Sequence, residues 1–264
     1  NSNLGIAITG AHGKTTTTYL LKAILEQAGG AKVGLIGTNQ NMIGGEALST
    51  ERTTPESFEV QKLFAEMRDA GCTHVVMEAS SHALYLDRVY GVRYAVGIFT
   101  NLTQDHLDYH KNMLEYRNVK KLFFDNLPAE AFALTNLDDR NGTVMLQNTR
   151  AEKKSYSVKG MADFKARIFE KHFDGTDIEI NGKELVVQFV GVFNVYNLLA
   201  VFGAALLLGM DEEEVLRELT LLHPVAGRFQ TLRSPKGYTA VVDYAHTPDA
   251  LSNVLHAIHE VLGN

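Results

Sequence analysis

The chain has 264 residues, which is long enough for two domains and a sizeable hydrophobic core. Hydrophobic residues make up 45% and charged residues 21%, a composition that excludes disordered, collagen-like and low-complexity proteins. The formal net charge of -6 argues against a protein that wraps duplex nucleic acid through its phosphates, but it does not exclude a local site for an anion.

The first half of the chain alternates short apolar runs with helical patterns, which is typical of a parallel sheet with crossover helices. We therefore predict an α/β fold in which a mostly parallel sheet is flanked by helices. The predicted strands span residues 4–9, 32–37, 73–79, 94–100 and 131–135, and the predicted helices span residues 14–28, 56–70 and 112–126.

A different pattern begins near residue 153. Residues 153–190 are rich in alternating strands, and Asn181-Gly182 between two of them is a strong signal for a β-hairpin. An all-helical stretch follows at residues 194–222. We therefore expect a small β-rich subregion within the α/β domain.

The last part of the chain is too short to fold as a domain. It contains one predicted strand at residues 238–243 and one predicted helix at residues 249–262, which together cannot enclose a core. The chain also begins Asn-Ser-Asn-Leu, without a methionine. We therefore expect a piece of a larger protein, with one domain at residues 1–226 and the start of a truncated second domain at residues 227–264.

The cysteine count and the hydropathy pattern indicate in which cellular compartment the protein works. Cys72 is the only cysteine, so the chain cannot form an internal disulfide or a cysteine-based zinc site. The sequence contains no signal-like segment and no apolar run of membrane-spanning length. These features predict a cytoplasmic protein that does not insert into a membrane, and we expect it to be a monomer.

The segment Thr9-Gly-Ala-His-Gly-Lys-Thr15 lies between a predicted strand and a predicted helix. It is a shortened P-loop, because Ile8 stands where the usual pattern has its first glycine. Gly10 and Gly13 let backbone N–H groups close on phosphate oxygens, Lys14 can reach the terminal phosphate, and Thr15 can bind Mg²⁺. The alternative is a glycine turn with a surface lysine, but the strand before and the helix after favour a nucleotide site.

Glu78 is a charged residue at the carboxyl end of a predicted central strand. Open parallel sheets bind ligands at this edge. A carboxylate there can hold the Mg²⁺ that bridges nucleotide phosphates, as in other P-loop enzymes. The alternative is a strand-end glutamate that faces water.

Two further features lie between residues 101 and 126. Residues 101–110 contain two aspartates and two histidines after a predicted strand, a density that suggests a metal or phosphate neighbourhood. In the next helix, Lys120 falls on the apolar face. Such a lysine either extends to a partner such as Asp105 or Asp108, or stays buried as a nucleophilic amine whose pKa desolvation lowers.

These segments belong to a larger set of motifs that is spread over nearly the whole chain. The set comprises residues 9–15, Glu-Arg-Thr-Thr-Pro at 51–55, residues 77–82, residues 100–110, residues 193–197, residues 227–229, and Asp-Tyr-Ala-His-Thr-Pro-Asp at 243–249. It resembles the Mur ligases of peptidoglycan synthesis, and most of all their MurE type, the UDP-N-acetylmuramoyl-L-alanyl-D-glutamate:amino-acid ligases.

The resemblance implies an enzyme of three domains, which bind the uridine, the ATP and the incoming amino acid. This chain would hold the ATP-binding central domain and the start of the Rossmann-like C-terminal domain. The implied activity is ATP-dependent amide formation, in which meso-diaminopimelate or L-lysine is added to UDP-MurNAc-L-Ala-D-Glu through an acyl phosphate. The implied partners are therefore ATP, Mg²⁺, the UDP-muramoyl-dipeptide and the amino acid, with no nucleic acid.

The resemblance also implies roles for single residues, by their positions in the motifs. The nucleotide contacts would be Gly10, Ala11, His12, Gly13, Lys14, Thr15, Thr16, Thr17, Asn197, Arg228, Asp243 and His246. One Mg²⁺ would be held by Thr15 and Glu78, and a second by Glu78, His106 and Lys120, the last as an N-carboxylated lysine. The muramoyl-peptide contacts would be Thr53, Thr54, Ser80 and Arg88, and the catalytic residues would be Lys14, Glu78, His106 and Lys120.

Other functions stay open at this point. The chain as given can be a module that binds ATP and Mg²⁺ without ligating. It can also belong to another Mur ligase, since His12 is the residue that the MurC branch has at this place. A folylpolyglutamate-synthetase-like ligase shares the chemistry, but the segments at 51–55 and 243–249 argue against it.

Overall fold

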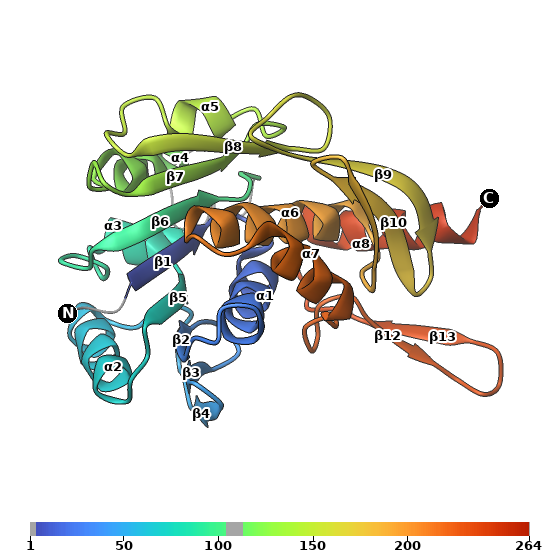
Figure 1. The fold of residues 1–264 in the computed structure, drawn as a ribbon, viewed down its shortest axis with the longest axis horizontal. Coiled ribbons are helices and arrows are strands. Elements are labelled where there is room, and N and C mark those ends of the chain that lie inside the picture. The colour runs from blue at the N-terminus through green and yellow to red at the C-terminus, as the bar shows by residue number, and fades with distance from the viewer. Residues whose placement is uncertain (1–3, 104–112, 264) are drawn as a thin grey trace.

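The fold is built on one large sheet. The computed structural model describes residues 4–103 and 113–263, and within these residues eleven strands pair in the order β11-β10-β9-β8-β7-β6-β1-β5-β2-β3-β4 (Figure 1). The pairs from β2 across to β9 are all parallel. Parallel pairing was predicted for the strands up to β7, but not for β8 and β9, which fall in the predicted β-rich stretch. The parallel strands are β1 (Leu4–Thr9), β2 (Val33–Ile36), β5 (His74–Glu78), β6 (Tyr94–Phe99), β7 (Phe132–Asn136), β8 (Glu152–Ser157) and β9 (Phe164–His172).

An antiparallel extension lies at each end of the sheet. The predicted hairpin at Asn181-Gly182 is confirmed, and both residues have positive φ, as a two-residue hairpin turn of type I′ requires. The hairpin at the other end was not predicted, because its strands are only three residues long. The extensions consist of β10 (Gly175–Ile180) and β11 (Lys183–Val187) at one end, and of β3 (Asn41–Ile43) and β4 (Glu46–Leu48) at the other.

Helices cover both faces of the sheet. Successive residues of a strand point to opposite faces, so Ile6 and Ile8 join a core cluster with α1, α6 and α7, whereas Ala7 joins a second cluster with α2 and α4. None of the helices in the described part of the chain is both long and apolar enough to cross a membrane. The helices are α1 (Lys14–Gln27), α2 (Ser57–Asp69), α3 (Ser81–Tyr85), α4 (Met113–Asp125), α5 (Gly142–Met145), α6 (Val192–Leu207), α7 (Glu212–Leu221) and α8 (Pro248–Leu262).

The predicted helical stretch at residues 194–222 consists of two helices. Gly209 has a φ of 86°, a left-handed conformation that stops α6 at little steric cost. Asp211 then caps α7, because its side chain accepts a hydrogen bond from the backbone N–H of Glu214 at 3.0 Å. The break lets α7 pack back against α6 and α1.

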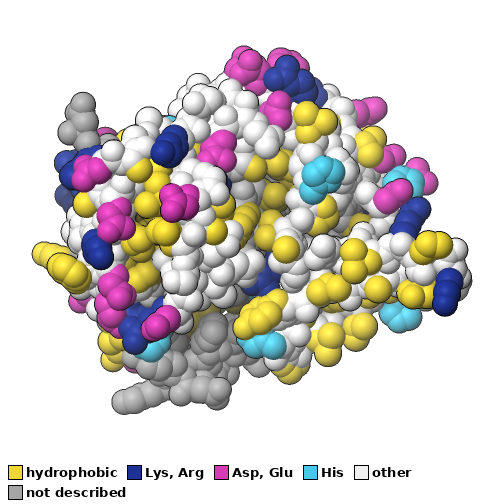
Figure 2. Space-filling view, turned by 90° about the horizontal axis from the view of Figure 1, so that it is seen from below, with side chains coloured by type: hydrophobic (Ala, Val, Ile, Leu, Met, Phe, Trp, Pro, Cys, Tyr) yellow, Lys and Arg dark blue, Asp and Glu magenta, His cyan; other side chains and the backbone are white. Residues whose placement is uncertain are grey.

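The C-terminal segment, residues 227–263, forms a small hairpin and a helix that packs against the main body. Strands β12 (Gln230–Arg233) and β13 (Thr239–Val242) pair only with each other in the described structure, and Figure 1 shows their hairpin projecting from the main body. Phe229 and Val254 pack with Val190 in a small apolar cluster. Figure 2 shows hydrophobic side chains gathered over the projecting part. The exposed large ones in this segment are Leu232, Tyr238, Val242, Tyr244, Leu251, Leu255 and Leu262.

The common direction of the parallel strands determines where a ligand site can form. Strands β1, β2, β5, β6 and β7 run the same way, so their carboxyl ends meet at one edge of the sheet. Thr9 and Glu78 end two of these strands and lie on neighbouring ones. The loops that follow the strands therefore surround one common region, which is where open parallel sheets bind ligands.

Candidate nucleotide and metal site

The loop between β1 and α1 has the geometry of an anion site. Gly13 has a φ of 87°, so a larger residue would be strained here, and its Cβ atom would have to displace the side-chain oxygen of Asn197. Lys14 begins α1, and the backbone N–H groups of the first helical turn have no acceptor within the helix. These N–H groups and the positive end of the helix face the loop, an arrangement that attracts phosphate.

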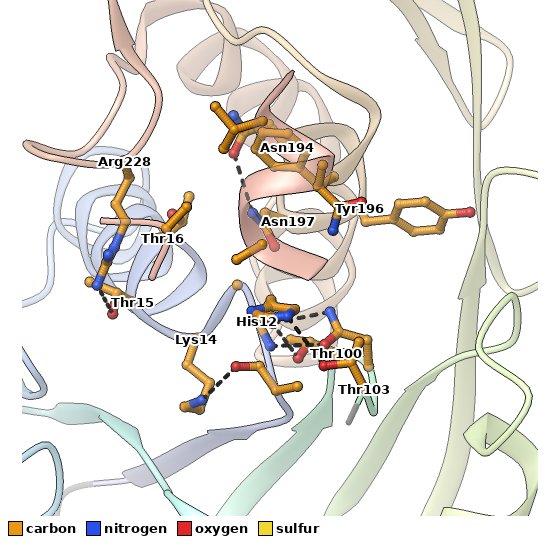
Figure 3. A pocket seen from close by; sticks show the side chains of 18 of the residues that line it. His12, Lys14, Thr15, Thr16, Thr100, Thr103, Asn194, Tyr196, Asn197 and Arg228 are labelled. Carbon is orange, nitrogen blue, oxygen red and sulfur yellow. Dashed lines mark hydrogen bonds between the residues drawn. The ribbon is translucent and has the colours of Figure 1, made fainter. Parts of the chain in front are cut away.

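Two polar residues after β6 hold this loop in place. The backbone N–H groups of Ala11 and His12 donate to the Asn101 backbone oxygen (2.9 Å) and side-chain oxygen (2.8 Å). The carbonyl of His12 accepts from the Thr100 hydroxyl at 2.7 Å. Figure 3 shows His12, Thr100 and Thr103 side by side at this point. Thr100 and Asn101 were in a recognised motif, but their structural role in the loop was not predicted.

The Lys14 side chain folds back over its own loop. Its Nζ donates to the carbonyls of Gly10 at 2.8 Å and Ala11 at 3.1 Å. The ammonium group thus lies at the mouth of the loop, where a terminal phosphate of a bound nucleotide would compete for the same hydrogens.

Glu78 is buried, so the alternative of a glutamate facing water is wrong. Its side chain is 1% exposed, and its carboxylate accepts hydrogen bonds from the hydroxyls of Thr15 at 3.1 Å and Thr38 at 2.9 Å. The backbone N–H of Thr38 donates to the other oxygen at 3.0 Å. Among the described residues no lysine or arginine forms an ion pair with Glu78. The negative charge is therefore held by hydroxyl and amide groups, with oxygen atoms of the kind that Mg²⁺ binds.

Lys120 lies inside the protein, on the apolar face of α4, as its spacing predicted. It is fully buried, and its Nζ donates to the Thr9 hydroxyl at 3.2 Å and to the Gly10 carbonyl at 3.4 Å. The ammonium also lies 4.8 Å from the centre of the Tyr116 ring. Burial lowers the pKa of Lys120 well below its usual value, and the charge of Lys14 lowers it further. Asp105, Asp108 and the predicted ligand His106 lie outside the described residues.

Residues from α6 and from the C-terminal segment close the other side of the site (Figure 3). The side-chain oxygen of Asn197 accepts from the Thr17 hydroxyl at 3.4 Å. Arg228 donates to the Thr15 hydroxyl oxygen at 3.1 Å and stacks on the Tyr244 ring, with 4.8 Å between the guanidinium carbon and the ring centre. Of the other two predicted contacts, His246 lines the cavity, and Asp243 also accepts hydrogen bonds from the backbone of Phe229 and Ala245.

The open cavity at this site is large enough for a nucleotide. Its volume is about 640 Å³, and its walls come from the loop, the edge of the sheet, α6 and the C-terminal segment. One wall contains Asp138, which was not predicted. Its carboxylate accepts hydrogen bonds from Ser157 at 2.6 Å and from Tyr196 at 2.7 Å. Burial raises the pKa of Asp138, but these hydrogen bonds and two from the backbone outweigh that effect and lower it.

The four predicted substrate residues lie together beside Glu78. The Thr54 hydroxyl donates to the backbone oxygen of Glu78 at 2.7 Å and accepts from the backbone N–H of Ser80 at 3.2 Å. Arg88 donates to the Thr54 carbonyl at 3.3 Å and pairs with Glu56 at 3.0 Å, while its buried Nε has no hydrogen-bond partner in the described structure. Thr53 and Ser80 line the cavity itself.

The substitution Glu78→Gln tests the metal role. The amide keeps the shape of the side chain and loses its charge, so we expect Mg²⁺ to strengthen ATP binding about tenfold less in the variant than in the wild type. Calorimetric titration of ATP with and without Mg²⁺ measures this effect. Glu46→Gln, which removes an exposed carboxylate elsewhere in the sheet, is the matched control. Equal Mg²⁺ dependence in wild type and Glu78→Gln would give Glu78 a purely structural role.

Comparison with known proteins decides the family. A sequence profile for the Mur ligase middle domain matches residues 8–205. The chain belongs to the Mur ligase family. The resemblance of the motifs to this family is thereby confirmed, and so is the predicted class of fold.

Individual Mur ligases show how far the similarity extends. The chain is 56% identical over 257 residues to proteins of Parabacteroides distasonis and Bacteroides fragilis named UDP-N-acetylmuramoyl-L-alanyl-D-glutamate--2,6-diaminopimelate ligase. In both cases the match covers 97% of this chain and 53% of the relative, so the chain spans about half the length of these ligases.

Solved structures agree with the sequence comparison. A structure of a ligase with the same name superposes on the whole chain with a TM-score of 0.86 and 29% identity, and 55% of that ligase is matched. A MurC structure from Thermotoga maritima gives a TM-score of 0.72 at 23% identity, over 99% of this chain and 55% of that one, which shows the shared fold alone.

Proposed function

We propose that this chain supplies the ATP-binding core of an ATP-dependent ligase of peptidoglycan precursor synthesis. The ligase would join an amino acid to UDP-N-acetylmuramoyl-L-alanyl-D-glutamate, and the names of the relatives favour 2,6-diaminopimelate over L-lysine. We further propose that it is a cytoplasmic monomer whose partners are small molecules.

One observation carries this proposal beyond family membership. The buried carboxylate of Glu78 contacts the hydroxyl of Thr15, at the start of α1 and directly beside the Lys14 loop. A hydroxyl and a carboxylate in contact at the amino end of a helix are the groups that P-loop enzymes use to hold Mg²⁺ against nucleotide phosphates. The geometry therefore supports a Mg²⁺–ATP site.

The residues present fit a magnesium ion. Thr15 and Glu78 offer hard oxygen ligands, which Mg²⁺ prefers, and the resemblance implies a second Mg²⁺ held by Glu78, His106 and Lys120. Bound Mg²⁺ would neutralise the negative charge that develops on the transferred phosphoryl group. Lys14 would contribute a second positive charge by turning from the carbonyls of its own loop to the terminal phosphate.

The proposed chemistry removes the difficulty that a carboxylate oxygen is a poor leaving group. A carboxylate oxygen of the D-glutamyl residue attacks the γ-phosphorus, the bond to the bridging oxygen breaks, and ADP leaves. The amine of the amino acid then attacks the acyl carbon, phosphate leaves with the former carboxylate oxygen, and the amine loses a proton. The side chains of the site would position the reactants and stabilise charge, without forming a covalent bond to the substrate.

A chimeric ligase tests the proposed function directly. The 257 matching residues of the Parabacteroides distasonis ligase would be replaced with those of this chain. We expect the chimera to form an amide from UDP-MurNAc-L-Ala-D-Glu and diaminopimelate in the presence of MgATP, as detected by mass spectrometry. The same chimera with Lys14→Ala is the control. A chimera that binds MgATP but forms no amide with either diaminopimelate or L-lysine would contradict the proposed function.

The 264-residue chain by itself is expected to bind MgATP and to form no amide product. The resemblance places the uridine and the amino acid on other domains, and without them the reactants lose the high effective concentration that a binding site provides. Mass spectrometry of a mixture with both substrates checks this expectation. Amide formation by the chain alone would show that residues 1–264 hold both substrates.

Lys120 is expected to be N-carboxylated in the functional state. Its burial favours the neutral amine, which is the form that reacts with CO2, and the product would offer a carboxylate to Mg²⁺ held near Glu78 and His106, as the resemblance implies. Carbon-13 NMR of the chain with labelled bicarbonate, Mg²⁺ and an ATP analogue above neutral pH should show one carbamate signal that is absent in Lys120→Met. A spectrum without this signal in the wild type would contradict the modification.

A further inference from the structure

Three metal-binding side chains lie together on the hairpin of β9 and β10, outside the cavity. Glu170 and His172 are two residues apart on β9, so they point to the same face of the hairpin. Asp177 on β10 pairs directly with Glu170 across the strands and shares that face. Gly175 lies opposite His172 and adds no side chain that would crowd the imidazole.

The distances between these side chains fit one shared ion. Nε2 of His172 lies 3.5 Å from Oδ1 of Asp177 and 4.0 Å from Oε2 of Glu170, and the three potential ligand atoms all lie within 4.8 Å of one another. In a tetrahedral zinc site with bonds of about 2.1 Å, neighbouring ligand atoms are roughly 3.4 Å apart. Small side-chain rotations would bring the three ligand atoms from their present distances to those of a zinc site. Such rotations are possible because none of the three side chains is fully buried.

No positive side chain neutralises the two carboxylates. Within the described structure, the polar contacts of the Glu170, His172 and Asp177 side chains are with one another. Lys171 points to the opposite face and pairs with Glu260 of α8 at 2.7 Å, and Arg233 approaches Asp174 in the turn at 3.6 Å. The trio therefore keeps two negative charges and an imidazole nitrogen directed at a common point.

We propose that Glu170, His172 and Asp177 bind a divalent transition-metal ion, with water completing the coordination. The imidazole favours ions of the zinc and cobalt type over Mg²⁺ and Ca²⁺, which prefer oxygen ligands alone. The ion would link the two strands of the hairpin close to the point where Lys171 joins it to α8. This site is separate from the nucleotide cavity and does not depend on the proposed ligase function.

Calorimetric titration of the 264-residue chain with Zn²⁺, in the absence of nucleotide, tests the proposal. We expect His172→Ala and Asp177→Asn each to lose one binding event or to weaken it at least tenfold. Titration with Co²⁺ should give the visible absorption of a tetrahedral site in the wild type only. Thermal unfolding without metal verifies that each variant is folded, and Zn²⁺ should raise the unfolding temperature of the wild type more than that of either variant.

Two control variants show whether Zn²⁺ binding depends on this cluster specifically. Glu184→Gln removes an exposed carboxylate from the neighbouring strand β11 and should leave Zn²⁺ binding unchanged. Glu78→Gln alters the nucleotide site and should also keep this binding event, which separates the two sites. Equal stoichiometry and affinity for Zn²⁺ in the wild type and His172→Ala would overturn the proposal and leave the cluster as polar contacts within the hairpin.

Discussion

Lys14→Ala is expected to weaken the binding of MgATP to the 264-residue chain at least tenfold. The Lys14 ammonium lies at the mouth of the loop, 2.8 Å from the Gly10 carbonyl, and can exchange this contact for a terminal phosphate. Hydrogen bonds to charged groups contribute about 1.5–3 kcal/mol, which corresponds to roughly a ten- to 150-fold change in affinity. Isothermal titration calorimetry measures the difference.

Two variants serve as controls for this result. Lys62→Ala removes the same charge from α2, far along the chain from the loop, and should bind MgATP like the wild type. Lys14→Arg keeps the charge in a different geometry, so its affinity for MgATP should lie between those of the wild type and Lys14→Ala. If Lys14→Ala binds MgATP as tightly as the wild type, the assignment of the loop to the phosphates is wrong.

Lys120→Met is expected to raise the free energy of unfolding at pH 7 by about 1 kcal/mol or more, because each unit by which burial lowers the pKa of Lys120 costs about 1.4 kcal/mol of stability, and methionine carries no such cost. Burial lowers the pKa of Lys120 in the folded chain, whereas the unfolded chain keeps its usual value. Between these two pKa values the unfolded chain binds more protons, so the stability of the wild type should rise with pH and level off above about pH 10.4.

Urea unfolding at several pH values between 7 and 10 measures both effects. Lys120→Met should give a flatter dependence of stability on pH than the wild type. Lys121→Met, which alters the neighbouring lysine and its 2.9 Å ion pair with Asp125, should keep the slope of the wild type. Parallel pH profiles for wild type and Lys120→Met would show that Lys120 is charged in the folded protein.

The predictable part of the fold is the part that depends on local pattern. The apolar runs and helical spacings of the first half predicted the parallel strands and their helices, because each element buries one continuous face. Strand β12 was missed because Gln230–Arg233 contains one large apolar residue and lies half exposed. The order of strands in the sheet was not predicted either, since it depends on contacts between residues far apart in the chain.

In the candidate nucleotide and metal site, too, the residues that could be predicted are those that stand out in the local sequence pattern. Glu78 was found because a charged residue at the end of an apolar strand stands out in the sequence. Thr38 lies two residues after β2, the strand beside β5, and donates two hydrogen bonds to Glu78, yet a threonine in such a loop gives no comparable signal. Asp138 follows β7 and could have been considered by the same strand-end rule. His106 cannot be compared, because it lies outside the described residues.

The contact between Arg228 and Thr15 couples cation binding in the Lys14 loop to the attachment of the C-terminal segment. The Thr15 hydroxyl oxygen accepts a hydrogen bond from Arg228, which belongs to the C-terminal segment, residues 227–263. A cation bound at this oxygen would repel the guanidinium, so it would loosen the attachment of that segment. By thermodynamic reciprocity, the attached arginine must weaken cation binding by the same factor. Occupancy of the Thr15 oxygen by a cation would thus shift the conformational equilibrium of residues 227–263.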